Sequence, residues 1–121
     1  QDVSRHQFYI TRDSILILPL IGLFNKLQVY FINLKTGKEI LSDTRTYLYE
    51  VWLKEHQGKM QLVTSNLPTE DMNGVYKSTL SRYEITQDQI ILLQEKKIKL
   101  KGEKLDLDLK DQQKLIEPMF K

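Results

Sequence analysis

The chain has 121 residues, a length that fits one domain spanning 1–121 and can bury a core without disulfides or metal ions. It contains no cysteine, which excludes disulfides, thiolate zinc sites and cysteine nucleophiles. Its 18 Lys and Arg residues nearly balance its 16 Asp and Glu residues, and the resulting charge of +2 lacks the basic excess of nucleic-acid-binding proteins.

Composition and pattern both favour strands. The chain has no alanine, the best helix former, and Ile, Leu, Tyr, Thr and Val carry the apolar pattern. Short alternating runs are separated by turn residues, which is typical of antiparallel sheets. We therefore predict an all-β fold with a short C-terminal helix, either an antiparallel β-sandwich (Ig-like) or a small barrel of about 7–9 strands.

The start of the chain bears on its location. It begins at Gln1 without an initiator methionine. Cleavage of a secretory signal would explain this start, as would a lipoprotein signal whose acylated cysteine provides a lipid anchor just upstream of Gln1. Excision of a domain from a longer protein is the alternative. We take export to the periplasm or cell envelope as the hypothesis.

The longest apolar run extends from Ile15 to Phe24. It is about half as long as a transmembrane helix, and Pro19 and Gly22 interrupt it, so we expect no membrane span. The run 26–34 is apolar on both faces, which predicts a central strand covered from both sides. The expected strands are 6–12, 14–18, 26–34, 38–42, 46–55, 59–64, 74–85, 90–101 and 104–110.

Three turns predict hairpins. Gly37 and Gly58 end four-residue turns that favour a type I turn with a bulge, and Gly102-Glu103 favours a type II′ turn. The last hairpin aligns apolar residues on one face and opposite charges on the other, which fixes its register. The expected cross-strand pairs are Ile32 with Ile40, Trp52 with Leu62, Leu100 with Leu105, Ile98 with Leu107, Lys99 with Asp106, and Lys97 with Asp108.

The C-terminal tail is the one segment with a helical pattern. We predict a helix over 111–117, with Asp111 as its N-cap and Pro118 as its end. Leu115 and Ile116 are expected to dock on the sheet.

We find no catalytic or metal-binding pattern. The two histidines, His6 and His56, have no zinc-binding spacing, no Gly-x-Ser-x-Gly elbow occurs, and the glycines are scattered one per turn. The lysines at 96, 97, 99 and 101 lack interleaved aromatic residues and are interpreted as a solvated strand face. We predict a non-enzymatic protein without cofactor or metal that binds another protein and no nucleic acid.

The candidate binding residues come from a loop and an aromatic side chain. Ser65 to Gly74 is rich in turn formers and is expected to be the longest irregular stretch, and such loops often carry function. Trp52 falls on the more polar face of its strand, where we expect it to be partly exposed or to cover an edge. The predicted binding residues are Trp52, Glu70, Asp71 and Met72.

Three segments carry a resemblance: Ile-Thr-Arg-Asp-Ser-Ile (10–15), Leu-Gln-Val-Tyr-Phe-Ile (27–32) and Gly-Val-Tyr-Lys-Ser-Thr-Leu (74–80). Within residues 8–95, the strand order and length are similar to those of small periplasmic lipoproteins of Gram-negative bacteria. Some of these are immunity proteins of type VI secretion systems. The resemblance implies a protein that binds and blocks a cognate toxin, and it carries over no functional residue. The alternatives are a lipocalin-like carrier of a small apolar ligand and an accessory structural subunit of an envelope or secretion assembly.

Overall fold

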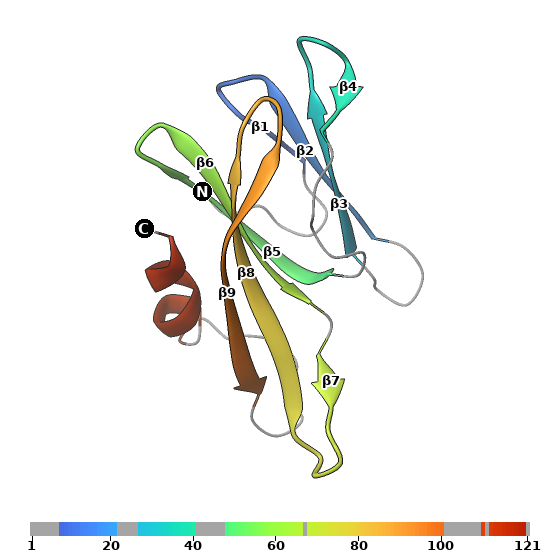
Figure 1. Ribbon diagram of the computed structural model, residues 1–121, viewed down its shortest axis with the longest axis vertical. Helices are drawn as coiled ribbons and strands as arrows, with labels where there is room; N and C mark the ends of the chain where they lie inside the picture. Colours follow the sequence, from blue (N-terminus) through green and yellow to red (C-terminus); the bar gives the residue numbers. More distant parts are fainter. Residues whose placement is uncertain are drawn as a thin grey trace.

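Antiparallel strand pairing organises most of the molecule (Figure 1). The structure, a computed structural model, describes residues 8–21, 27–40, 48–66, 68–100, 110 and 112–120. Its strands are β1 (Tyr9–Ile10), β2 (Ile15–Ile21), β3 (Leu27–Asn33), β4 (Lys38–Glu39), β5 (Leu48–His56), β6 (Lys59–Asn66), β7 (Thr69–Glu70), β8 (Tyr76–Ile85) and β9 (Ile90–Leu100). The predicted all-β fold is confirmed.

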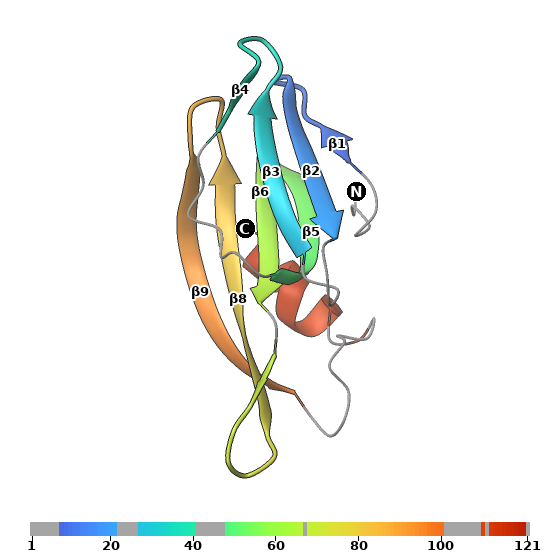
Figure 2. The same ribbon diagram turned by 90° about the vertical axis from the view of Figure 1, so that its right-hand side faces the viewer.

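The strands form one hydrogen-bonded path that folds into two layers. The order is β1-β2-β3-β5-β6-β8, with β4 paired to β3, and with β7 and β9 both paired to β8. One residue pair, Leu27 with Leu48, joins β3 to β5, so the sheet turns there. Strands β1–β4 make the front layer and β5–β9 the central layer (Figure 2). No pairing among the described residues joins β1 to β9, so the sheet is open and sandwich-like, and the barrel alternative is wrong.

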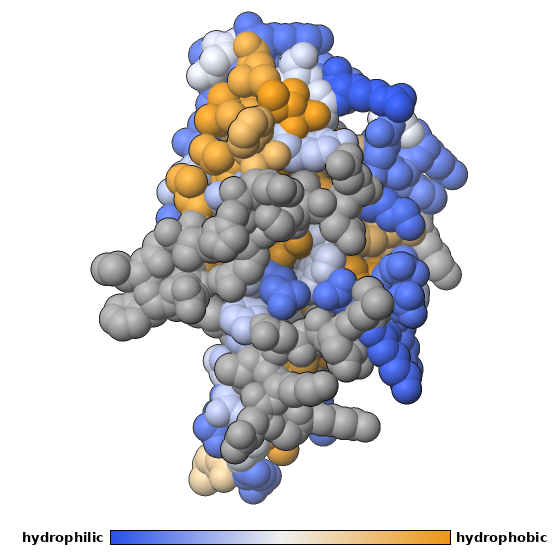
Figure 3. Space-filling model, turned by 180° about the vertical axis from the view of Figure 1, so that it is seen from behind, coloured by the Kyte–Doolittle hydropathy of each residue, from blue (hydrophilic) through white to orange (hydrophobic). Residues whose placement is uncertain are grey.

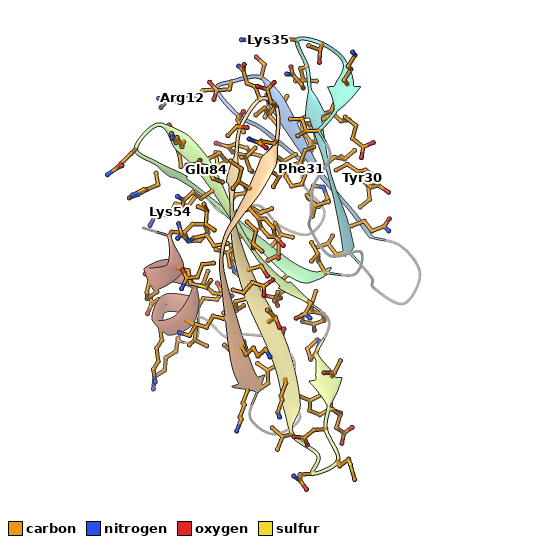
Figure 4. All side chains as sticks on the ribbon, viewed as in Figure 1. Arg12, Tyr30, Phe31, Lys35, Lys54 and Glu84 are labelled. Carbon is orange, nitrogen blue, oxygen red and sulfur yellow. The ribbon has the colours of Figure 1, made fainter. Side chains whose placement is uncertain are left out.

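The first core lies between these two layers. Alternate side chains of β2 and β3 point inward, because successive residues of a strand face opposite sides. Figure 4 shows this for two neighbours on β3: Phe31 points toward the central layer and Tyr30 away from it. The members of the first core are Ile15, Ile17, Leu27, Val29, Phe31, Ile40, Leu48, Val51, Leu53, Met60, Leu62, Tyr83, Ile85 and Ile90.

The second core lies on the opposite side of the central layer, under the C-terminal segment. There Trp52, Val63, Leu80, Ile98 and Leu100 meet residues of the chain's last turns. Strand β6 is therefore covered on both faces, and Met60 to Ser65 are all buried. The prediction that 26–34 is the doubly covered strand is wrong, because β3 has buried residues only at alternate positions.

The C-terminal segment consists of a short π-helical turn, η2 (Gln112–Ile116), and a 3₁₀ turn, η3 (Glu117–Met119). Leu115 and Ile116 contact the second core as predicted. Pro118 does not end the helix: it lies in the first turn of η3, where an N–H is not needed. The predicted cap, Asp111, lies outside the described residues.

The β5–β6 hairpin differs from the prediction by one residue in register. Gln57 and Gly58 have φ angles of 53° and 79°, so they form a two-residue turn with positive φ at both central positions. Trp52 therefore pairs with Val63 rather than with Leu62. The shift places Trp52 and Val63 together in the second core.

The β3–β4 hairpin is also shifted by one residue. The Gly37 N–H donates to the Asn33 carbonyl (2.7 Å), which closes a longer turn than expected and pairs Ile32 with Glu39. Ile40 then donates its N–H to Phe31 O (2.7 Å) and is buried in the first core. The hairpin predicted across Gly102-Glu103 and the strand predicted over 104–110 fall in a part of the chain where only Lys110 is described.

Strand β2 continues through Pro19, although the prediction ended that strand at residue 18. The Leu34 N–H donates to Ser14 O (2.8 Å), so the backbone groups of even positions point toward β3. The Thr11 N–H donates to Ile15 O (2.9 Å), so those of the odd positions of β2 point toward β1. The Pro19 nitrogen therefore faces the outer edge of the sheet. A strand tolerates proline at such a position because no ladder hydrogen bond is lost.

Candidate functional site

Three of the four predicted binding residues lie together at the β7–β8 hairpin. The stretch 65–74, expected to be irregular, contains the end of β6 and the whole of β7, which pairs Glu70 with Tyr76. Glu70 is exposed, Asp71 is half-buried, and Met72 is fully exposed at the turn. This hairpin forms the lower tip of the molecule in Figure 1.

Asp71 shapes the turn rather than offering a free carboxylate. Its Oδ1 accepts hydrogen bonds from the N–H groups of Asn73 (2.8 Å) and Val75 (2.9 Å), and its Oδ2 lies 3.5 Å from Lys77 Nζ. The pKa of Asp71 lies below its ordinary value, mainly because its carboxylate accepts the hydrogen bond from Val75. The hydrogen bond from Asn73 and the positive charge of Lys77 lower this pKa further. The carboxylate therefore stabilises the hairpin.

Trp52 is not part of this site. Only 6% of its surface is exposed, because it packs in the second core with Ile116, Met119 and Phe120. The expectation of a partly exposed tryptophan is wrong. It rested on the polar neighbours of Trp52 along β5, whereas burial at this position comes from the C-terminal segment.

A cationic groove adjoins the hairpin. It has a volume of about 360 Å³ and lies over β7, β8 and β9. Lys77 stands directly opposite Lys99 in the strand register, and Thr79 stands opposite Lys97. The groove is lined by Asn66, Thr69, Lys77, Ser78, Thr79, Lys97, Ile98 and Lys99.

The largest exposed apolar feature in the described part of the chain is the outer face of the front layer, which we call the outer face. Its exposed members range from 46% exposure at Leu34 to 63% at Phe8, and the others are half-buried. The strand register aligns them in rows across β1, β2 and β3, and Figure 3 shows them as one apolar patch. The outer face comprises Phe8, Ile10, Leu16, Leu18, Leu20, Tyr30, Ile32 and Leu34.

No member of the outer face is charged, although Glu39 on β4 stands opposite Ile32 at its border, and its one phenol is partnered. The Tyr30 hydroxyl donates to Gln28 Oε1 (3.1 Å). Charged residues lie beyond its upper end, at Arg12 and Lys35 (Figure 4). An apolar centre with a charged rim is the usual anatomy of a protein–protein interface.

The edges of the sheet are less suited to binding than this face. Pro19 removes a donor from the outer edge of β2, and the lysines at 96, 97 and 99 are exposed along β9, as expected for a solvated strand face. Proline and lysine at edges both discourage the addition of another strand. A partner is therefore better accommodated by side-chain packing on the outer face than by backbone pairing at an edge.

Two further kinds of feature, metal-ligand clusters and membrane-spanning helices, are absent from the described residues. No group of three His, Cys, Asp or Glu side chains among them is arranged to hold a metal ion. In the same residues, no helix has the length and apolarity to cross a membrane. His56 lies half-buried at the end of β5, and His6 is outside the described residues.

Comparisons with known proteins add no family to these observations. The chain matches no protein-family model, and neither the curated proteins nor the solved structures contain a significant match to it. The resemblance to periplasmic lipoproteins thus stays a prediction.

Sequence reasoning missed the outer face, although the signal was present. Apart from Gln28 and Asn33, both the even and the odd positions of β2 and β3 are apolar. Such a pattern predicts a strand that is covered on both faces. The alternative, one face left open for a partner, fits the same pattern.

Proposed function

We propose that this chain is a non-catalytic protein-binding domain whose outer face docks on an apolar surface of a different protein. The observation that carries the proposal is the uncharged apolar patch on β1–β3, which is separate from both cores. Monomeric proteins rarely expose a contiguous apolar patch of this kind unless it binds something. The core of such an interface is depleted in charge, as this face is.

The periplasm or cell envelope is the proposed location, and a toxin is the proposed partner. Both are supported by the resemblance of residues 8–95 to small periplasmic lipoproteins, some of them immunity proteins. Blocking a toxin requires binding alone, which accords with a surface that packs against a partner rather than one that reacts.

The test compares two charge-adding double variants of the full chain. Ile10→Lys/Leu20→Lys places two lysines on the outer face, at positions that are 52% and 47% exposed. Leu92→Lys/Leu93→Lys places two lysines on β9, at positions that are similarly exposed, and is the matched control. Partners captured by the wild type from a bacterial envelope extract are identified, purified and titrated against each form by calorimetry.

We expect the outer-face variant to lose at least tenfold in affinity, which corresponds to about 1.4 kcal/mol, and the control to bind as the wild type does. Equal affinity of all three forms would overturn the proposal. Sedimentation of the wild type alone is the second measurement. We expect a monomer. A dimer that the outer-face variant dissolves would mean that a second copy covers this face, and would also overturn the proposal.

A further inference from the structure

The cationic groove contains three lysines, at positions 77, 97 and 99. Lys77 has Asp71 at 3.5 Å. Within the described part of the chain, no carboxylate lies within ion-pair distance of Lys97 or Lys99. Lys99 also stands directly opposite Lys77, and like charges in that relation destabilise a strand pair. An anion in the groove would relieve this repulsion.

The wall of the groove is fixed by hydrogen bonds. The Asn66 side-chain oxygen accepts from Ser78 Oγ (2.9 Å) and from the Thr79 N–H (2.6 Å). The Ser78 hydroxyl also contacts the Asn66 carbonyl (2.9 Å). The end of β6 is thereby fastened to β8 beside the lysines, so the groove has a defined shape before any ligand arrives.

The spacing of Lys97 and Lys99 matches that of alternate residues in an extended peptide. Lys97 and Lys99 lie two residues apart on one face of β9, a separation of about 6.8 Å along the strand. Carboxylates at alternate positions of an extended peptide repeat at the same distance. The threonine hydroxyls at 69 and 79 add hydrogen-bonding groups for its backbone or side chains.

A nucleic acid suits the groove less well. Binding of single strands uses aromatic side chains as stacking platforms, and the described lining contains none. The apolar part of the lining is aliphatic, at Ile98.

We propose that this groove binds an extended acidic segment of a protein, with alternate carboxylates on Lys97 and Lys99. The site is distinct from the outer face, so it goes beyond the proposed function. Each of the two proposals can fail without the other, since the tests alter different residues.

The experiment uses a fluorescein-labelled peptide with three Glu-Thr repeats and measures its anisotropy with the full chain. Lys97→Glu/Lys99→Glu reverses two charges of the groove. Lys96→Glu/Lys114→Glu makes the same change in net charge at two exposed positions outside it, since Lys96 pairs with Leu80 on the other face of β9. Circular dichroism and Tm confirm that both variants fold.

We expect the wild type to bind the peptide, the groove variant to bind at least tenfold more weakly, and the control variant to stay within twofold. A block peptide, with three glutamates followed by three threonines, is expected to bind more weakly than the alternating one. Equal losses in the two variants, or equal binding of the two peptides, would mean non-specific attraction and would overturn the proposal. Preference for an oligothymidylate over the alternating peptide would do so as well.

One competitor lies in the chain itself, because the sequence predicts that Asp106 and Asp108 pair with these lysines. The variant Asp106→Asn/Asp108→Asn tests this. We expect its affinity for the alternating peptide to equal that of the wild type. An increase of tenfold or more would show that the chain's own aspartates hold Lys97 and Lys99, and the external site would be refuted.

Discussion

Strands β6 and β2 lie in different layers, and in both the burial of the side chains differs from what the sequence suggests. β6 contains Gln61, Thr64 and Ser65, yet both of its faces are buried. β2 is apolar at every position, yet its even residues face outward, and Leu20 is 47% exposed. In these two strands, the polarity of the sequence therefore does not indicate which residues are buried.

Hydrogen bonds explain how β6 is buried. The Gln61 side-chain oxygen accepts from Arg82 (3.3 Å), and the Ser65 hydroxyl accepts from the Glu50 N–H (3.1 Å). A buried polar group costs little when it is hydrogen-bonded. No comparable argument explains the apolar residues on the outer side of β2, since packing does not require them there. This excess of apolar surface is the reason to assign the outer face a binding role.

The largest expected effect comes from the second core, where the C-terminal segment packs on the central layer. Trp52→Ala should lower the free energy of unfolding by about 3–5 kcal/mol, because it removes a buried indole from between β5 and the C-terminal segment. Urea unfolding followed by circular dichroism measures this. Trp52→Phe, which keeps an aromatic ring, is the control and should lose less. A loss below about 1 kcal/mol for Trp52→Ala would place the indole at the surface, as the sequence alone suggested.

A pair of identical substitutions tests the comparison directly. Leu62→Ala on β6 removes a side chain with 0% exposure and should cost about 2–5 kcal/mol of unfolding free energy. Leu20→Ala on β2 changes a half-exposed leucine and should cost less than about 1 kcal/mol. The order should reverse for partner binding, since only Leu20 lies on the outer face. Equal destabilisation by the two would show that the outer side of β2 is covered.

The sequence predicted the fold class because period-two alternation depends on local geometry. Strand positions, the docking of Ile116 and the exposure of the lysines on β9 all follow from that pattern. Register did not follow, because it depends on the conformation of single residues. Gln57 adopts a positive φ of 53°, which a non-glycine residue rarely does, and this shortens the β5–β6 turn by enough to move Trp52 to a new partner.

The candidate site was predicted only in part for a similar reason. Glu70, Asp71 and Met72 are close in sequence, so a turn brings them together. The outer face and the cationic groove each combine side chains from several strands, and the register of the strand pairs decides which of these side chains lie side by side. Alternation within one strand does not determine that register. The role of Asp71 also depends on tertiary detail, since its partner Lys77 lies across the hairpin.

The smallest effect concerns the tip of the β7–β8 hairpin, residues 71–74, which belong to neither core. Because the pKa of Asp71 is lowered in the folded chain, its ionised form stabilises the fold at neutral pH. That contribution is present above the ordinary value of 3.8 and is lost as the pH falls through the folded value. Asp71→Ala should therefore lower Tm slightly at pH 7, and the difference from the wild type should shrink in acid.

Two further variants separate the causes. Asp71→Asn keeps an oxygen for the N–H groups of Asn73 and Val75 but loses the charge beside Lys77, so its Tm should lie between those of Asp71→Ala and the wild type. Glu70→Ala removes the neighbouring carboxylate without touching those hydrogen bonds and is the control. Scanning calorimetry across the acid range measures all four forms. If the gap between Asp71→Ala and the wild type were the same in acid as at pH 7, the stabilisation would not come from the ionised carboxylate, and the hairpin would owe its shape to Gly74 and the strand ladder instead.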